Sequence, residues 1–172
     1  VLALSISSCR INFSDNEIAG NGTIVTKQRA INQSFDKINV SNGITAKISQ
    51  NDHKEIAVTI DENLQENIEI YVENQTLFIK ATEMFVTSED IVVTISNPEF
   101  KGIKTSSGAK VSSQNTIKTI YLLAETSSGS EIDIDVEADE LLASSSSGSE
   151  INLKGKALTA DFQSSSGSSL DG

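Results

Sequence analysis

A short Ser-Gly motif recurs four times toward the end of the chain, and its spacing constrains the fold more than any other feature. The copies read TSSGA, TSSGS, SSSGS and SSSGS, and their glycines are Gly108, Gly129, Gly148 and Gly167. The interval from one glycine to the next is nearly constant. A period of about 20 residues is typical of chains that stack one short structural unit on the next. We therefore expect repeating β rungs from residue 101 onward.

Alignment on these glycines places similar residues in the same columns. The residue three after each glycine is apolar, and this column contains Val111, Ile132, Ile151 and Leu170. The residues next to each glycine are small. Side chains on alternate positions of an extended chain share one face. This parity predicts that the Ser before each glycine points inward at a tight corner, while the glycine supplies the bend. The predicted corner residues are Ser107, Gly108, Ser128, Gly129, Ser147, Gly148, Ser166 and Gly167.

The same parity makes two further predictions. Replacing Ser128 with Leu should overpack the corner, whereas the same change at Ser127 should be nearly silent. The column seven residues before each glycine should begin the core, and it contains Lys101, Leu122, Leu141 and Ala160. The opposite parity carries an acidic face, with Glu125, Glu131, Asp133, Asp135 and Glu150.

Elsewhere in the chain the hydrophobic pattern also has period two. Short β-rich runs such as EIAVTI, NIEIYV and TLFIKA are bounded by Asn, Asp and Gln clusters. Only residues 61–67 favour one short helical turn. Aromatic residues make up 5% of the chain, so a narrow aliphatic core is expected. The predicted fold class is all-β: a single-stranded β-helix with rungs of about 19–21 residues, preceded by a less regular β region.

The first residues resemble the end of a bacterial lipoprotein signal peptide. An apolar run is followed by Ser7-Ser8-Cys9, and Cys9 is the only cysteine. This pattern predicts a residual signal segment over 1–9 with lipidation at Cys9, a polar tether over 10–30 and the folded domain over 31–172. The alternative is an ordinary first strand with a buried cysteine. The run is too short to span a bilayer.

Charge and motifs exclude several functions. The net charge of −11 argues against nucleic acid and against adsorption to anionic lipid. A serine hydrolase needs a base, and the lone His53 lies far in sequence from the Ser-Gly motifs. Ser107-x-x-Lys110 matches a catalytic pattern only formally. The rungs lack calcium-binding nonapeptides, and a polysaccharide lyase would need basic residues against its substrate. We expect no enzyme activity and no cofactor or metal.

Several phrases in a fixed order resemble the putative auto-transporter adhesin head GIN domain family, which consists of exported proteins, often lipoproteins, common in Bacteroidetes. The opening phrase is carried by Phe35, Ile38, Val40, Gly43, Ile44, Ala46, Ile48 and Gln50. ENQTLFIKA at 73–81 and IVVTISNPEFKGIKTSSGAKV at 91–111 follow, and then the Ser-Gly rungs. The resemblance covers about 35–172. It implies a β-helix in an exported protein, and it implies that the chain stops within a rung.

The resemblance and the residues together predict a non-enzymatic adhesion or ligand-interaction module of the cell envelope. The expected partners are the outer membrane, through the lipid on Cys9, and a glycan or protein ligand. Tyr71 and Tyr121 are candidate sugar platforms, with packing as the competing role. A structural or spacer role is the first alternative, and a polysaccharide-active enzyme is the second.

Overall fold

The structure of the protein is a computed structural model that describes residues 18–172. The predicted signal segment and Cys9 lie outside the described residues. The elements in chain order are β1 (Ile18–Ala19), β2 (Ile24–Gln28), β3 (Lys37–Val40), β4 (Thr45–Gln50), β5 (Glu55–Asp61), the 3₁₀ helix η1 (Glu62–Asn67), β6 (Ile68–Glu73), β7 (Thr76–Ala81), β8 (Phe85–Val86), β9 (Val92–Asn97), β10 (Gly102–Thr105), β11 (Lys110–Ser113), β12 (Ile117–Thr126), β13 (Glu131–Ser145), β14 (Glu150–Ser164) and β15 (Ser169–Asp171).

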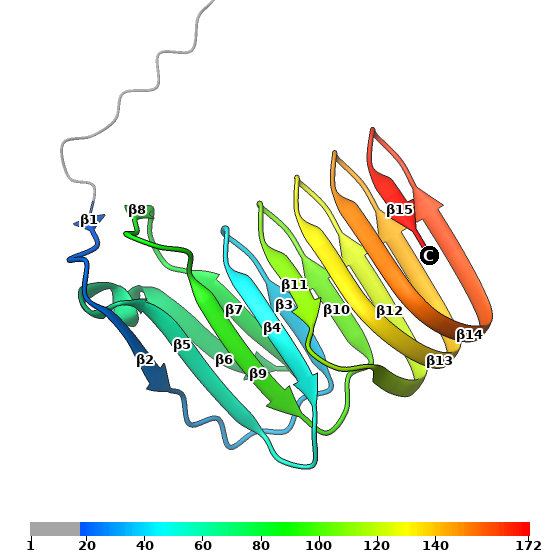
Figure 1. The fold of residues 1–172 in the computed structure, drawn as a ribbon, viewed down its shortest axis with the longest axis horizontal. Helices are drawn as coiled ribbons and strands as arrows, with labels where there is room; N and C mark the ends of the chain where they lie inside the picture. The colour runs from blue at the N-terminus through cyan, green and yellow to red at the C-terminus, as the bar shows by residue number, and fades with distance from the viewer. Residues whose placement is uncertain (1–17) are drawn as a thin grey trace, which may run out of the picture.

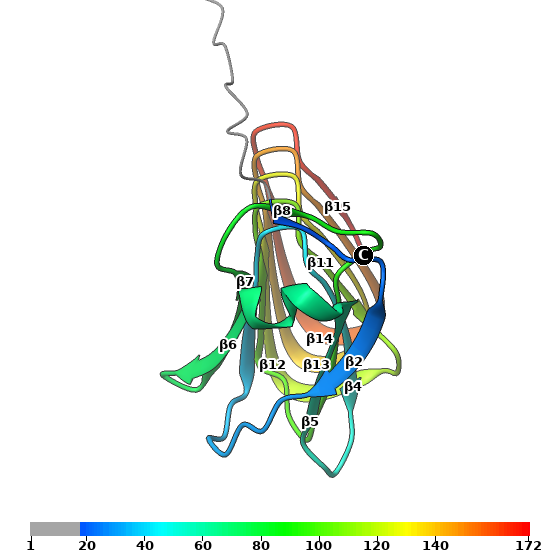
Figure 2. The ribbon, with the colours of Figure 1, turned by 90° about the vertical axis from the view of Figure 1, so that its left-hand side faces the viewer.

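All strands except β1 and β8 belong to one sheet of 13 strands, which curls into a half-barrel. Figure 2 shows the curl end on, as two walls that meet where β12, β13 and β14 bend. Wall A contains β6, β7, β3, β10 and the C-terminal halves of β12, β13 and β14. Wall B contains β2, β5, β9, β4, β11, the N-terminal halves of β13 and β14, and β15. The apolar core lies between the walls.

The prediction of a single-stranded β-helix is wrong. The sheet has a mixed strand order, with β2, β5 and β9 antiparallel on wall B and β6 antiparallel to β7 on wall A. The turn between β6 and β7 shows the physical reason. Asn74 and Gln75 both have positive φ, at +49° and +60°, which is the backbone of a tight hairpin turn. A hairpin forces its two strands to be antiparallel, so the parallel pairing ends at β7 on wall A, and on wall B it ends at β9, beyond which β5 is antiparallel.

The repeat spacing appears in the structure as the register of the parallel strands. Leu122 of β12 lies beside Leu141 of β13, and Ile132 of β13 lies beside Ile151 of β14, so each partner stands one repeat further along the chain. Between β10 and β12 the repeat is slightly longer, with Ile103 beside Ala124. In-register pairing stacks like on like, so each apolar column becomes a continuous strip of core.

The Ser-Gly motifs form tight turns that join wall A to wall B. In the second copy Ser128 and Gly129 have φ of +57° and +67°, the left-handed pair of a type I′ turn. Ser128 is exposed, whereas Thr126 and Ser130 are buried. The prediction that Ser128 points inward is therefore wrong, and with it the expected contrast between Ser127 and Ser128. Two consecutive left-handed residues reverse the chain and break the alternation on which the parity argument relied.

The buried hydroxyls at these turns bond to one another. Thr105 Oγ1 donates to Thr126 Oγ1 at 2.8 Å, and Ser130 Oγ lies 3.0 Å and 2.6 Å from these two oxygens. Ser130 Oγ also donates to the carbonyl of Ser127 at 2.7 Å, and Ser149 repeats this bond to Ser146 at 2.6 Å. Buried hydroxyls with such partners avoid the cost of unsatisfied polar groups. In the second, third and fourth copies the serine after the glycine, not the one before it, closes the turn with its hydroxyl.

Replacing Ser147 with Asn should stabilise the protein. Ser147 is exposed with φ of +56°, a conformation that costs roughly 1–2 kcal/mol for most L-residues but that Asn tolerates. The chain itself uses Asn42, with φ of +62°, in an equivalent turn. Urea unfolding should show a gain of up to about 1 kcal/mol. The control Ser144→Asn, within β13, should show none, and a loss of stability in Ser147→Asn would contradict the turn assignment.

The 3₁₀ helix η1 closes the N-terminal end of the core, between β6 of wall A and β2 and β5 of wall B (Figure 2). Leu64 and Gln65 are buried there, and Gln65 Nε2 donates to the carbonyls of Val25 and Val58 at 3.0 Å and 3.1 Å. The predicted short helical turn at 61–67 is confirmed. Because η1 spans from wall to wall, it fixes how far apart the walls stand at this end.

Strand β2 pairs with β5 in the antiparallel direction, so the prediction of a polar tether is wrong for Ile24–Gln28. Asp61 holds the turn that precedes β2. Its carboxylate is buried and accepts hydrogen bonds from Gly22 N at 2.7 Å, Ser88 N at 3.0 Å and Ser88 Oγ at 2.8 Å. The bond from the Ser88 backbone is the main cause that lowers the pKa of Asp61. The carboxylate is thus ionised at neutral pH and ties β2 to the segment after β8.

Candidate ligand-binding face

The outer face of wall A has a hollow of about 210 Å³ where Gly102 carries no side chain. Gly102 stands in a row of outward-facing residues on neighbouring strands, between Lys37 of β3 and Leu123 of β12. Thr76 of β7 continues the row beyond Lys37. The stem of Lys37 bends over the glycine, so that a Cβ built on Gly102 would lie 3.0 Å from Lys37 Cγ. Gly102 is buried beneath this stem, and the apolar side chains of Phe78 and Leu123 line the hollow around it.

An aromatic pair borders the hollow on the side of β7. Phe78 lines it, and the ring of Phe78 stacks on Tyr71 of β6, with centroids 5.1 Å apart and an interplanar angle of 12°. Lys80 Nζ lies 5.3 Å from the centroid of Tyr71 and 3.0 Å from Glu69 Oε2. This carboxylate is the main cause that raises the pKa of Lys80. The stack holds Phe78 upright on the sheet, with Tyr71 on the side away from the hollow.

Three charged side chains surround the hollow. Lys104 Nζ lies 3.5 Å from Glu125 Oε2 across β10 and β12, and both residues line the hollow. Lys37 is exposed, and within residues 18–172 no carboxylate lies in ion-pair distance of its ammonium group. The hollow thus offers one free cation and one neutralised pair around an apolar floor.

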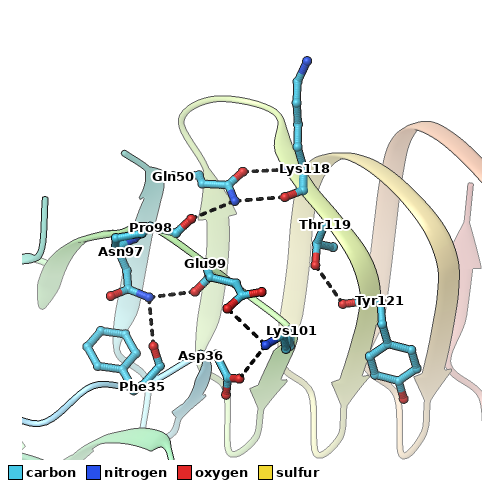
Figure 3. A network of polar contacts seen from close by, with 10 residues as sticks. All are labelled: Phe35, Asp36, Gln50, Asn97, Pro98, Glu99, Lys101, Lys118, Thr119 and Tyr121. Carbon is cyan, nitrogen blue, oxygen red and sulfur yellow. Dashed lines mark hydrogen bonds and ion pairs between the residues drawn. The ribbon is translucent and has the colours of Figure 1, made fainter. Parts of the chain in front are cut away.

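A polar network fixes the strands just before the hollow (Figure 3). Lys101 Nζ lies 3.2 Å from Asp36 Oδ2 and 3.0 Å from Glu99 Oε2, and the backbone N of Lys101 donates to the Asp36 carbonyl at 2.6 Å. The bond to Glu99, followed by that to Asp36, raises the pKa of Lys101. Asp36 and Lys101 directly precede Lys37 and Gly102 in the chain. Their pairing therefore sets the register of β3 and β10 where the hollow begins.

Two amide side chains extend this network (Figure 3). Asn97 Nδ2 donates to the carbonyls of Phe35 at 3.0 Å and Glu99 at 2.7 Å. Gln50 Oε1 accepts from Lys118 N at 2.7 Å, while Gln50 Nε2 donates to the Lys118 carbonyl at 2.9 Å. Both amides bond backbone groups that no neighbouring strand reaches. They anchor the connections that lead into β10 and β12.

The eight predicted corner residues lie elsewhere, along the edge where the turns stack, and none of them lines this hollow. Backbone bonds join consecutive turns: Gly108 N donates to the Ser128 carbonyl at 3.1 Å, and Gly129 N donates to that of Ser147 at 3.1 Å. The stack begins at Asn42-Gly43, where Gly43 N donates to the Ser107 carbonyl at 3.0 Å. Sequence reasoning missed this first turn, although Asn-Gly is itself a strong turn signal.

The acidic residues predicted on one face are divided between two. Glu125 faces outward from wall A, whereas Glu131 and Asp133 face outward from wall B. Lys110 Nζ lies 3.0 Å from Glu131 Oε2, and Lys154 Nζ lies 3.5 Å from Asp133 Oδ1. The prediction of a single acidic face is wrong because the turn at Gly129 moves the chain from one wall to the other. Much of the negative charge is locally neutralised across the strands.

The structure separates the residues of the formal catalytic patterns. His53 lies in the connection between β4 and β5, at the end of wall B opposite the Ser-Gly turns. Its Nε2 lies 3.7 Å from Glu55 Oε2. The hydrogen bond to Glu131 raises the pKa of Lys110, which keeps this lysine protonated and unsuited to act as a base for Ser107.

The hollow itself was missed by sequence reasoning. Tyr71 was named as a platform candidate, and it lies beside the hollow through its stack on Phe78. Tyr121, the other candidate, lies on the same wall and is half-buried, outside the set of lining residues. The missed signal was Gly102 within the run KGIKT, since a glycine inside a strand often marks a close approach by a ligand or another backbone.

Comparison with known proteins gives one family and several related folds. The family model described as "Putative auto-transporter adhesin, head GIN domain" matches residues 34–172. No curated protein matches the chain. Among solved structures, a "putative adhesin" from Parabacteroides distasonis is 19% identical with a TM-score of 0.71, and the match covers 91% of this chain and 76% of that one.

Two further structures share the fold. A "Putative lipid binding protein" from Parabacteroides distasonis is 18% identical with a TM-score of 0.75, over 91% of this chain and 76% of that one. A "putative adhesin" from Parabacteroides merdae is 15% identical with a TM-score of 0.56, over 90% of this chain and 98% of that one. The TM-scores of these three structures establish a common fold. Over residues 18–172, none of the helical structure is long and apolar enough to cross a membrane.

Proposed function

Because the chain belongs to the family of putative auto-transporter adhesin head GIN domains, we propose that it is a non-enzymatic, exported binding module of the adhesin type. Its ligand is a glycan, and the binding site is the hollow at Gly102 on the outer face of wall A. The observation that carries this proposal is a strand glycine whose missing side chain leaves a hollow between Lys37 and Leu123, beside the stacked ring of Phe78.

A glycine at this position has a cost that folding alone does not explain. Gly102 has no positive φ and belongs to a central strand, so a side chain would suit its backbone. Glycine in the middle of a strand is destabilising by roughly 0.5–1 kcal/mol relative to Ala. The nearest atom to an added Cβ belongs to the flexible, exposed stem of Lys37. Keeping the site open at the expense of stability is typical of a position where a ligand approaches the backbone.

The test measures binding and stability in the same variant, because the two are expected to change in opposite directions. Replacing Gly102 with Val should fill the hollow and abolish binding to a broad array of immobilised glycans, while the melting temperature stays the same or rises. The matched control is Thr94→Val, an exposed strand position on wall B, which should leave array binding intact. Binding that survives in Gly102→Val would place the ligand elsewhere, and a silent array with the unaltered protein would overturn the glycan-binding role.

We further propose that the protein is held at the cell envelope by a lipid on Cys9, which supports an adhesive role by keeping the domain at a surface. The support is the small-residue sequence before this single cysteine. Replacing Cys9 with Ala in the exported precursor should move the protein from the membrane fraction to the soluble fraction. Unchanged membrane association of Cys9→Ala would refute the anchor.

A further inference from the structure

We propose that the ligand of the Gly102 hollow is a saccharide whose terminal residue carries one carboxylate, an inference that rests on the proposed function. The carboxylate pairs with Lys37, and the apolar face of the sugar ring lies against Phe78. Glu125 and Lys104 bond the hydroxyls at the other side of the hollow. Each part of this assignment follows from a separate observation on wall A.

The ring of Phe78 favours a flat, weakly apolar ligand surface. One face of Phe78 is covered by Tyr71, and the residue also lines the hollow, so the side away from Tyr71 faces the space a ligand would fill. The volume of about 210 Å³ suits a single ring more than a long chain. Thr76 and Asn39 line the same hollow and supply a hydroxyl and an amide. An apolar ring face surrounded by hydrogen-bonding groups is the chemistry of a sugar.

Lys37 favours a negative charge on that sugar. Its stem lies over Gly102, and its ammonium group has no carboxylate in ion-pair distance within the described residues. The other lysine of the hollow, Lys104, is already paired with Glu125. A carboxylate on the ligand would pair with this free ammonium group. Such a charge-assisted bond is stronger than a bond between neutral groups.

The net charge of the protein limits the ligand to a single acidic group. At −11 the chain repels a polyanion over distances of about 10 Å at ordinary salt, whereas a pair in direct contact is less screened. The other cation of the hollow, Lys104, is paired with Glu125, so Lys37 alone is left for a ligand carboxylate. The surroundings thus select a terminal acidic residue on an otherwise neutral saccharide.

The test compares two immobilised oligosaccharides that differ only at the terminal residue, glucuronate in one and glucose in the other. The unaltered protein should bind the glucuronate probe more tightly, by about tenfold or more. Lys37→Met keeps the stem over Gly102 and removes the charge, so it should abolish the preference and leave the weaker binding of the glucose probe. Lys47→Met makes the same charge change on the exposed face of wall B and should preserve the preference.

The outcomes separate this inference from the proposed function. Equal binding of the two probes, with loss of both in Gly102→Val, would overturn the acidic ligand and leave the glycan site standing. A preference that Lys47→Met removes as well as Lys37→Met would show a general charge effect and overturn the role of Lys37. Tight binding of dodecanoate, lost in Gly102→Val, with no binding of either saccharide, would overturn both proposals in favour of an aliphatic ligand.

Discussion

Replacing Gly155 with Ala is expected to detach β14 from β13 where the two strands bend together. Gly155 pairs with Val136 and has φ of +142°, a region that is essentially restricted to glycine. A Cβ at this position would overlap the carbonyl oxygen of Val136, which is backbone and cannot turn aside. The backbone strain alone costs roughly 1–3 kcal/mol, and relieving the overlap costs roughly 1–3 kcal/mol more.

Hydrogen exchange and urea unfolding together measure this effect. The amides of β14 beyond residue 155 should lose protection, while those of β10 and β3, further from the change, should keep theirs. Gly148→Ala is the matched control, because Gly148 has φ of +69° but nothing lies within 4 Å of an added Cβ. It should cost only the left-handed conformation, roughly 1–2 kcal/mol. Equal losses in the two variants would show that Val136 does not restrict the bend.

Replacing Phe100 with Ala is expected to be the most destabilising change in the core. Phe100 is fully buried two residues before β10 and is the largest such side chain in the described part of the protein. Truncating a buried Phe to Ala typically costs roughly 3–5 kcal/mol, because it removes buried area and leaves a cavity. Urea unfolding should show this loss. Met84→Ala, at a position 86% exposed, should change stability by less than about 0.5 kcal/mol.

Phe100 also shows where a parity argument fails. The repeat alignment predicts Lys101 in the core column with Leu122 and Leu141, and those two leucines are buried. Lys101 instead faces outward to Asp36 and Glu99, which corrects that prediction, and Phe100 fills the core one residue earlier. The chain bends at Lys101, so strict alternation begins only at Gly102. A loss in Phe100→Ala as small as that in Met84→Ala would contradict this placement.

The candidate site could also be predicted only in part from the sequence. Tyr71 could be named as a platform from the sequence, since an aromatic residue on a polar strand face is visible in the pattern. Gly102 was also visible as a glycine inside the strand KGIKT. Its grouping with Phe78 and Lys37 was not, because the three residues come from β10, β7 and β3 and are far apart in the chain. Only strand order brings them side by side.

The sequence by itself determined the all-β class, the family, and the spacing that becomes the register of the parallel strands. These follow from local pattern. Period-two alternation favours strands, and a regularly repeated turn motif spaces them, whichever segments later pack beside them. The tertiary structure decided what depends on pairs of distant segments: the curled mixed sheet, the division of the acidic residues between two walls, the outward position of Ser128, and the hollow at Gly102. Each of these depends on the order of the strands in the sheet. Hairpins, left-handed turns and ion pairs such as Asp36–Lys101 set that order.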